Sequence, residues 1–295
     1  MARAGTPVTQ LVSPGRRAGR LLAGLMLLAV TACSTGFIYN RVGWAVSWYV
    51  GGFVSLDESQ ERQLQDAVRR TLVWHRATQL ERYVGVLEGL AAAAAGPLTV
   101  DTLQGQYQEA EQLLSDLLGQ IAPDAARLLG SLDAGQRAEL ARNLEESNAE
   151  LREDRAGQDP QARQQRRSKV AVRVIQRFTG RLTPAQRQLV GERLATMQDL
   201  DDAWLQRRQA WQQQLLGLLE TSDRGPAFEQ AVRDLLLDSA RAGGEDYRRG
   251  AEANRRVVLA MLAALSETLD PGQRERLQRK LRGYAQDLRR LAEAG

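Results

Sequence analysis

Leu56-Asp57-Glu58-Ser59-Gln60 is the first of four copies of a short phrase that decides the fold. It recurs as Leu132-Asp133-Ala134-Gly135-Gln136, Leu182-Thr183-Pro184-Ala185-Gln186 and Leu269-Asp270-Pro271-Gly272-Gln273. The spacing is that of a capping box: Asp or Thr at the N-cap accepts a hydrogen bond from the third helical amide, and the Gln side chain at that position accepts one from the N-cap amide. The phrases therefore predict four helix starts.

Apolar residues at alternating spacings of three and four extend these starts into amphipathic helices. We expect helices over 58–95, 101–121, 133–154, 161–179, 183–221, 226–241, 245–267 and 271–293, with a helical turn over 123–129. No stretch alternates apolar and polar residues between hairpin turn signals. The expected fold class is all-α, and two long capped helices favour an elongated multi-helix bundle.

The order of these elements allows two related helical halves, 57–181 and 182–295. Each half would begin with a long capped helix that ends in Gly-Pro, at Gly96-Pro97 and at Gly225-Pro226. The two halves share little sequence identity, so duplication of an ancestral unit stays one alternative and independent helices the other.

The N-terminal 32 residues have the composition of a secretory signal peptide. Three arginines precede a short apolar run, Leu21–Val30, and small residues follow it. That run is too short to span a bilayer, which needs roughly 20 apolar residues. We therefore divide the chain into a signal over 1–32, an aromatic lead-in over 33–56 and a helical bundle over 57–295.

The end of this segment, Val30-Thr31-Ala32-Cys33, resembles the lipobox of bacterial lipoproteins. The resemblance implies cleavage before Cys33 and acylation of Cys33 as the first residue of the mature chain. Ser34 follows where Asp would favour the inner membrane, so the resemblance implies an outer-membrane lipoprotein that faces the periplasm. Cys33 is the only cysteine, so no disulfide forms within the chain.

The signal also carries the excess positive charge of the chain. The full sequence has 40 basic and 36 acidic residues, and residues 1–32 hold four arginines and no acid. The remaining chain has a net charge of about zero and therefore lacks the excess positive charge that is typical of nucleic-acid-binding proteins. We expect no nucleic-acid partner.

The lead-in 37–53 is rich in aromatic side chains: it holds six of the fifteen in the chain, namely Phe37, Tyr39, Trp44, Trp48, Tyr49 and Phe53. Trp and Tyr favour the membrane–water interface, and the segment begins four residues after the predicted anchor. Packing into the bundle core, contact with the membrane interface and binding of a partner are all open interpretations.

Several local motifs together resemble an uncharacterised family of bacterial helical lipoproteins, domain of unknown function 6279. They are Tyr39-Asn40-Arg41, Trp48-Tyr49, Leu56-Asp57-x-x-Gln60, Trp74-His75-Arg76 and Arg82-Tyr83. The resemblance implies an envelope lipoprotein with a helical body. It implies no enzymatic activity or other molecular function, because none is established for the family. The repeated phrase is also similar to the LTxxQ signature of small periplasmic stress chaperones, which only residues 182–186 match outright.

His75 is the only histidine, so a zinc site with several histidine ligands is excluded, and a histidine-based catalytic triad would need this same imidazole as its base. It lies on the apolar stripe of the first long helix, where a core position with a hydrogen-bond partner is expected. We predict no catalytic residue, no metal and no cofactor. Candidate contacts for a ligand or partner are Trp74, His75 and Arg76, together with Tyr39 and Asn40.

The stretch 152–193 holds eleven basic and four acidic residues. It predicts either a solvated arginine face that pairs with acidic neighbours or a surface for an anionic lipid or an acidic protein. Arg163, Arg166 and Arg167 are the candidate contacts. The carboxylates at Asp199, Asp201 and Asp202 are expected on a solvated helix face.

The sequence thus favours a non-catalytic envelope protein that binds, scaffolds or assists the folding of a partner. Expected partners are the membrane, through the lipid anchor, and an envelope protein or an anionic lipid. An accessory factor or enzyme acting on cell-wall or lipid substrates is the alternative. It would require a deep cleft with several polar side chains of shifted pKa.

Overall fold

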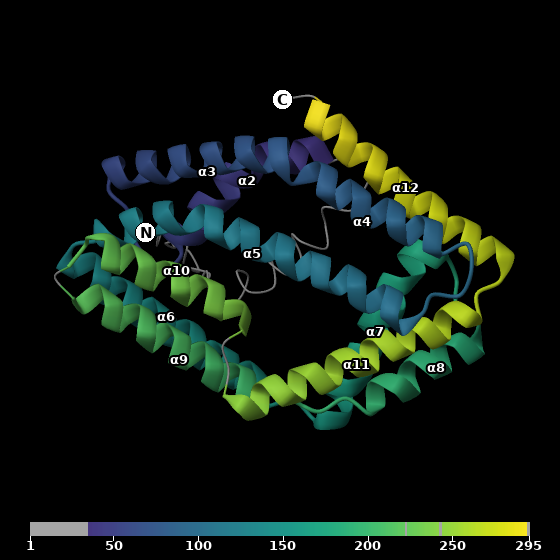
Figure 1. The fold of residues 1–295 in the computed structure, drawn as a ribbon. Helices are drawn as coiled ribbons and strands as arrows, with labels where there is room; N and C mark the ends of the chain where they lie inside the picture. The colour runs from purple at the N-terminus through teal and green to yellow at the C-terminus, as the bar shows by residue number, and fades with distance from the viewer. Residues whose placement is uncertain (1–34, 222, 242–243, 294–295) are drawn as a thin grey trace, which may run out of the picture.

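The computed structural model describes residues 35–221, 223–241 and 244–293, which form eleven helices and contain no strand (Figure 1). The all-α prediction is confirmed. The helices are α2 (Thr35–Gly51), α3 (Glu58–Thr78), α4 (Leu80–Ala93), α5 (Val100–Gly130), α6 (Ala134–Ala156), α7 (Pro160–Thr179), α8 (Pro184–Ala195), α9 (Asp201–Glu220), α10 (Pro226–Arg241), α11 (Glu245–Glu267) and α12 (Pro271–Glu293).

These helices follow the outline of a flattened, elongated ring (Figure 1). The most extensive packing joins elements far apart in sequence, α4 with α12 and α5 with α10. None of the described helices is long and apolar enough to cross a membrane.

All four capping phrases begin helices, as predicted. Asp57, Asp133 and Thr183 each form a complete capping box with the Gln three residues later. The fourth phrase makes the same two bonds, from the Gln273 amide to Asp270 at 2.8 Å and from the Asp270 amide to Gln273 at 3.2 Å. The leucine that opens each phrase packs inward; Leu182, for example, is 1% exposed.

The capping glutamines also join the phrases in pairs, which the sequence did not predict. Gln60 donates to the Gln136 side chain at 2.9 Å, and Gln136 donates back at 2.6 Å. Gln186 and Gln273 exchange the same bonds at 2.8 and 3.0 Å. Each predicted half of the chain therefore contains one glutamine pair, and the two pairs lie at opposite ends of the ring (Figure 1).

The hydrophobic core is divided between these ends. One cluster joins Val54, Leu132, Leu219 and Val232 with their neighbours beside the first glutamine pair. Another joins Val190, Leu194, Met261 and Leu265 on α8 and α11. The capping phrases thus lie beside two of the apolar clusters.

The predicted helix over 58–95 is wrong in its continuity, because it divides into α3 and α4 at Gln79. The Thr78 hydroxyl donates to the Trp74 carbonyl at 2.8 Å. Such a bond from Thr to the preceding turn tends to bend a helix. Beyond this point α4 packs along α12.

The predicted helix over 183–221 is also wrong, since α8 and α9 are separated by residues 196–200. Asn254 on α11 holds this connection in place. Its side-chain oxygen accepts from the Gln198 amide at 2.8 Å, and its side-chain nitrogen donates to the Gln198 carbonyl at 3.0 Å. These two bonds replace helical hydrogen bonds that a continuous helix would make.

Conversely, the predicted break at Pro123 does not occur, because α5 continues through it. Proline lacks an amide hydrogen and leaves the carbonyl four residues earlier without its helical partner. That carbonyl belongs to Gly119, and it accepts a hydrogen bond from Arg233 on α10 at 3.2 Å. A distant side chain therefore compensates for the proline.

Candidate functional site

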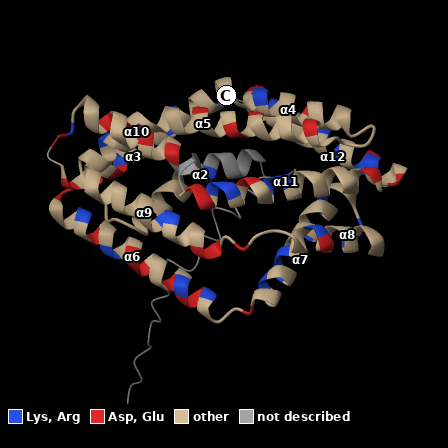
Figure 2. Cartoon of the chain, turned by 60° about the horizontal axis from the view of Figure 1, so that its bottom comes forward, with Lys and Arg blue, Asp and Glu red and all other residues tan. Residues whose placement is uncertain are grey.

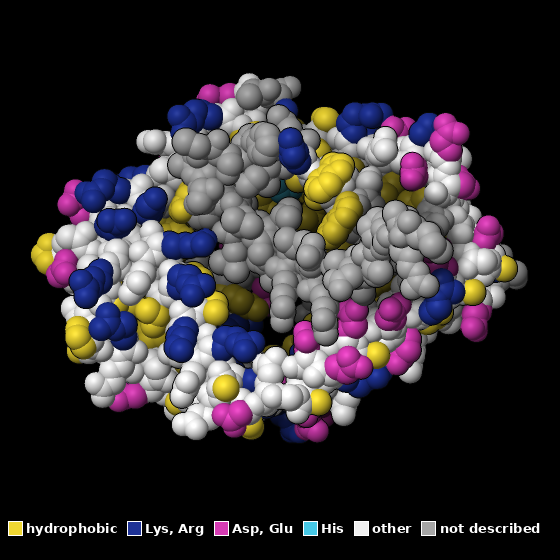
Figure 3. All heavy atoms as spheres, turned by 180° about the vertical axis from the view of Figure 1, so that it is seen from behind, with side chains coloured by type: hydrophobic (Ala, Val, Ile, Leu, Met, Phe, Trp, Pro, Cys, Tyr) yellow, Lys and Arg dark blue, Asp and Glu magenta, His cyan; other side chains and the backbone are white. Residues whose placement is uncertain are grey.

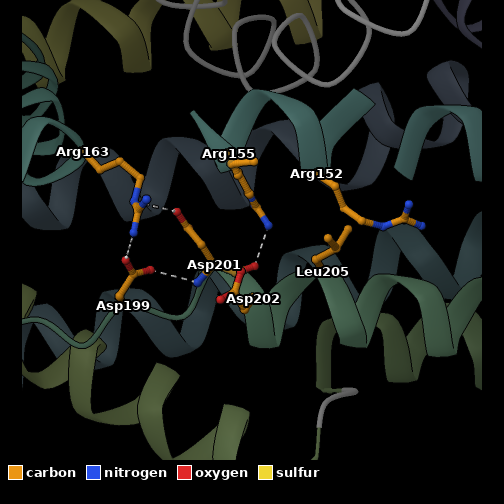
Figure 4. Close-up of a pocket in the computed structure, with 8 residues that line it drawn as sticks. Arg152, Arg155, Arg163, Asp199, Asp201, Asp202 and Leu205 are labelled. Carbon is orange, nitrogen blue, oxygen red and sulfur yellow. Dashed lines mark hydrogen bonds and ion pairs between the residues drawn. The ribbon is translucent and has the colours of Figure 1, made fainter. Parts of the chain in front are cut away.

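A pocket that we call the arginine–aspartate pocket opens where the end of α6 and the start of α7 meet the start of α9 (Figure 4). Its lining residues include arginines, aspartates and two apolar residues, Ala156 and Leu205. They are Arg152, Arg155, Ala156, Arg163, Asp199, Asp201, Asp202 and Leu205.

Arg163 and Asp199 form the firmest ion pair of the pocket, at 2.8 Å between Nη2 and Oδ2. Arg163 also donates to the Gln158 carbonyl at 2.8 Å, and its Nε lies 3.8 Å from Asp201. The hydrogen bond from Arg163 holds the pKa of Asp199 below its usual value, and the Asp201 amide, 3.1 Å from Asp199, adds to the effect. Asp199 is therefore an anion at neutral pH.

Arg155 is held differently, by a carbonyl and an aromatic ring. Its Nη1 donates to the Asp201 carbonyl at 2.6 Å, and its guanidinium lies 5.0 Å from the centre of the Trp204 ring. Among the described residues no carboxylate lies within ion-pair distance of Arg155. Arg152, at the other edge, directs its guanidinium away from Asp199 and Asp201 (Figure 4).

A second guanidinium, that of Arg208, approaches the Trp204 ring at 5.9 Å. Its acceptors are neutral: Asn148 at 3.0 Å and Ser147 at 3.1 Å. Burial lowers the pKa of Arg208, and nearby Tyr49 partly opposes this change. Two cations thus flank one indole beside the pocket.

This arrangement suits the recognition of a charged ligand. A guanidinium presents a planar fork of donors that matches a carboxylate or phosphate. The aspartates offer acceptors a few ångströms away, and Trp204 and Leu205 supply apolar contact. Within the described part of the chain, no three His, Cys, Asp or Glu side chains converge in a way that could hold a metal ion.

His75, a candidate from the sequence, lies on α3, outside this pocket. Its Nε2 is 3.2 Å from the Tyr83 hydroxyl, and it is half-buried. Burial lowers the pKa of His75 and raises that of Tyr83. Trp74 and Arg76 flank it on the same helix, so the three residues share an element and do not join the arginine–aspartate pocket.

The other candidates are distributed over α2 and α7. Arg163 lines the pocket, and Arg167 lies close enough to Asp199 to lower its pKa slightly. Arg166 is exposed on α7. Tyr39 and Asn40 belong to α2, and Cys33 lies outside the described residues.

The aromatic lead-in forms α2, and two of its indoles face solvent. Trp44 is 68% exposed and Trp48 42% exposed, and their rings stack with centres 6.4 Å apart. Val50 and Phe53, at and beyond the end of α2, pack against the core. The segment therefore packs against the bundle on one side and presents Trp44 and Trp48 to solvent.

Sequence reasoning missed Arg155, Trp204 and Arg208, and it placed Asp199 and Asp201 on a solvated face although they also line the pocket. The signal available was the density of arginine in 152–163 and the carboxylates at 199–202, both noted separately. Their meeting depends on the break between α8 and α9, which the apolar pattern did not reveal.

A family model matches residues 52–248 of the chain; its description is a family of unknown function, DUF6279. No curated protein and no solved structure matches the chain.

Proposed function

The chain belongs to DUF6279, a family of unknown function, and we propose that it is a bacterial envelope lipoprotein that binds a polypeptide partner without catalysing a reaction. The proposal has two parts: the anchor at Cys33 and the binding site at the arginine–aspartate pocket.

The anchor rests on the order of basic residues, apolar run and Val30-Thr31-Ala32-Cys33. Acylation at Cys33 would hold the helical body at a membrane surface. Ser34 supports placement on the periplasmic side of the outer membrane.

The single observation that carries the binding part is the pocket itself. It sets Arg155, which has no described carboxylate partner, beside an indole and opposite two aspartates. A polypeptide offers carboxylates for the guanidinium, amide hydrogens for the aspartates and apolar side chains for the indole. A nucleic acid would meet repulsion from Asp199, Asp201 and Asp202.

The electrostatics of the pocket favour binding over catalysis. A general acid or base at neutral pH needs a carboxyl pKa raised toward 7. The Arg163 hydrogen bond instead lowers the pKa of Asp199, which keeps it an ionised acceptor. The proposed periplasmic location and the LTxxQ match at 182–186 support a scaffold or chaperone-like role for such binding.

Pull-down from membranes after crosslinking in cells tests this function. We expect partners that crosslink to the wild-type protein to be lost from a variant with Arg152→Glu and Arg155→Glu. A matched variant, Arg69→Glu with Arg142→Glu, makes the same charge change on exposed positions of α3 and α6 and should retain them. An identical set of polypeptides with all three proteins would contradict the proposal.

A further inference from the structure

A stripe of exposed basic residues runs along α7, apart from the pocket. Arg166, Lys169, Arg173 and Arg177 recur at spacings of three and four, which places them on one helix face. The helix contains six basic residues and no acidic one. Nearly half of the Val170 surface is also exposed, at 48%.

A second basic group lies on α12, which packs against α7. Arg276, Arg279 and Lys280 line a shallow pocket with Gly283 and Tyr284, and no carboxylate is among the lining residues. Sequence reasoning had not identified this group. The spacing from 276 to 283 again selects one helix face.

Direct contacts join the two groups into one surface. The rings of Phe178 on α7 and Tyr284 on α12 meet edge to face, with centres 5.9 Å apart. Arg276 lies against Gly180, whose φ of 83° ends α7 in a conformation that favours glycine. Burial raises the pKa of Tyr284, and Arg177 lies close enough to oppose that change.

The exposed indoles of α2 belong to the same side of the molecule. α2 packs against α12 as well as α3. Seen from behind, Lys and Arg side chains gather over the end of the ring formed by α7, α8 and α12, and apolar side chains show near the middle of this face, over α2 (Figure 3). Figure 2 shows the basic residues along α7.

We propose that this face, formed by Trp44 and Trp48 of α2 and the basic residues of α7 and α12, lies on the surface of an anionic phospholipid bilayer. Indoles favour the interface between hydrocarbon and water, and each basic residue near an anionic surface strengthens binding. The inference rests on the anchor of the proposed function. α2 begins two residues after Cys33, a reach of at most about 7 Å, so an acylated Cys33 would hold α2 at the bilayer.

Vesicle flotation with the full-length, unacylated chain tests this orientation. The vesicles contain phosphatidylethanolamine with or without phosphatidylglycerol. Substitution of Arg276, Arg279 and Lys280 by Glu reverses three charges and should lower binding to the anionic vesicles by more than about a hundredfold. The matched control replaces Arg62, Arg69 and Arg142 by Glu and should bind like the wild type.

The milder triple substitution to Gln should give an intermediate loss, and circular dichroism should show that each variant is folded. The apolar residues of 1–32 are common to all the proteins, so binding to the vesicles without phosphatidylglycerol measures their contribution, which is subtracted before the variants are compared. Equal binding of wild type and the α12 variant to anionic vesicles would overturn the proposal, as would equal binding of wild type to both vesicle types.

A separate fluorescence measurement tests whether the two indoles contact the bilayer. Brominated acyl chains should quench the tryptophan fluorescence of the wild type, and Trp44→Phe with Trp48→Phe should remove most of that quenching. If the double variant is quenched as strongly as the wild type, Trp44 and Trp48 lie away from the bilayer, and their assignment to the membrane-facing surface is wrong. Because acylation of Cys33 is measured separately by mass, failure of the anchor can be told apart from failure of this face.

Discussion

The side chains of Gln60 and Gln136 each donate a hydrogen bond to the other, across 76 residues of sequence. Each also donates to the carbonyl that precedes the partner phrase: Gln60 to Ser131 at 3.0 Å and Gln136 to Ser55 at 2.9 Å. Gln186 and Gln273 repeat this pattern with Thr268 and Arg181. Each of these glutamines thus caps its own helix and also binds the start of that helix to the start of a second helix.

Gln186→Ala should destabilise the fold by about 2–3 kcal/mol, because it removes a capping bond and takes one hydrogen-bond partner from the buried Gln273 side chain. In a double-mutant cycle, Gln186→Ala and Gln273→Ala should show a coupling of about 1–2 kcal/mol in urea unfolding. Gln188→Ala, at an exposed position on α8, is the control and should change stability little. Additive effects of the two buried substitutions would show that the pair does not act as a unit.

Arg233→Ala should cost about 1 kcal/mol, because it leaves the Gly119 carbonyl without a donor. Pro123→Ala restores an amide hydrogen four residues after Gly119, so in that background Arg233→Ala should cost clearly less. Thermal unfolding of the four proteins measures this dependence. The same cost in both backgrounds would mean that Arg233 stabilises α5 by another route.

Asp199 should make stability depend on pH in the acid range. Its folded pKa lies below its unfolded value of 3.8, so the unfolded state binds the proton first and the stabilisation is present above that value. It is lost as pH falls through the folded pKa. The gap in stability between wild type and Asp199→Asn should therefore shrink between neutral pH and pH 3, as followed by urea unfolding.

Asp199→Asn in an Arg163→Gln background serves as the comparison for that titration, because the hydrogen bond that lowers the pKa of Asp199 is then absent. In that background the stability gap should change less over the same range. A gap for Asp199→Asn that stays constant with pH would indicate that the Arg163–Asp199 pair adds no ionisation-linked stability.

Cys33 should carry acyl chains in cells that process lipoproteins. Intact mass spectrometry of the membrane fraction should show a chain that begins at Cys33 with the added mass of lipid. Cys33→Ala should abolish both cleavage and modification, and Ser34→Asp should keep the modification while moving the protein toward the inner membrane. An unmodified thiol at Cys33 in the membrane-bound wild type would refute the anchor.

Local signals made the helix starts predictable, because a capping box lies within five consecutive residues. The helix ends were not predictable where a distant side chain decides them. Asn254 holds the break at Gln198 from 56 residues away, and Arg233 supports Pro123 from another helix. The spacing of apolar residues in the sequence reveals neither the Asn254–Gln198 contact nor the Arg233–Gly119 contact.

The candidate site was predictable only in part, for the same reason. The arginine-rich stretch pointed to Arg163, but its partner Asp199 is 36 residues further along the chain. Arg155 meets Trp204 only because the chain turns between α8 and α9. The sequence shows that these charged residues are present, but which of them contact one another depends on how the chain folds.

Photocrosslinking in cells from position 202 tests the central claim, polypeptide binding at the arginine–aspartate pocket, most directly. Asp202 is exposed and lines the pocket, so a photoreactive residue there should crosslink to a bound polypeptide. We predict a discrete crosslinked protein that disappears when Arg155→Glu is added and that is absent when the photoreactive residue replaces Gln188 on α8. No polypeptide crosslink from position 202, or one that Arg155→Glu leaves unchanged, would contradict the account.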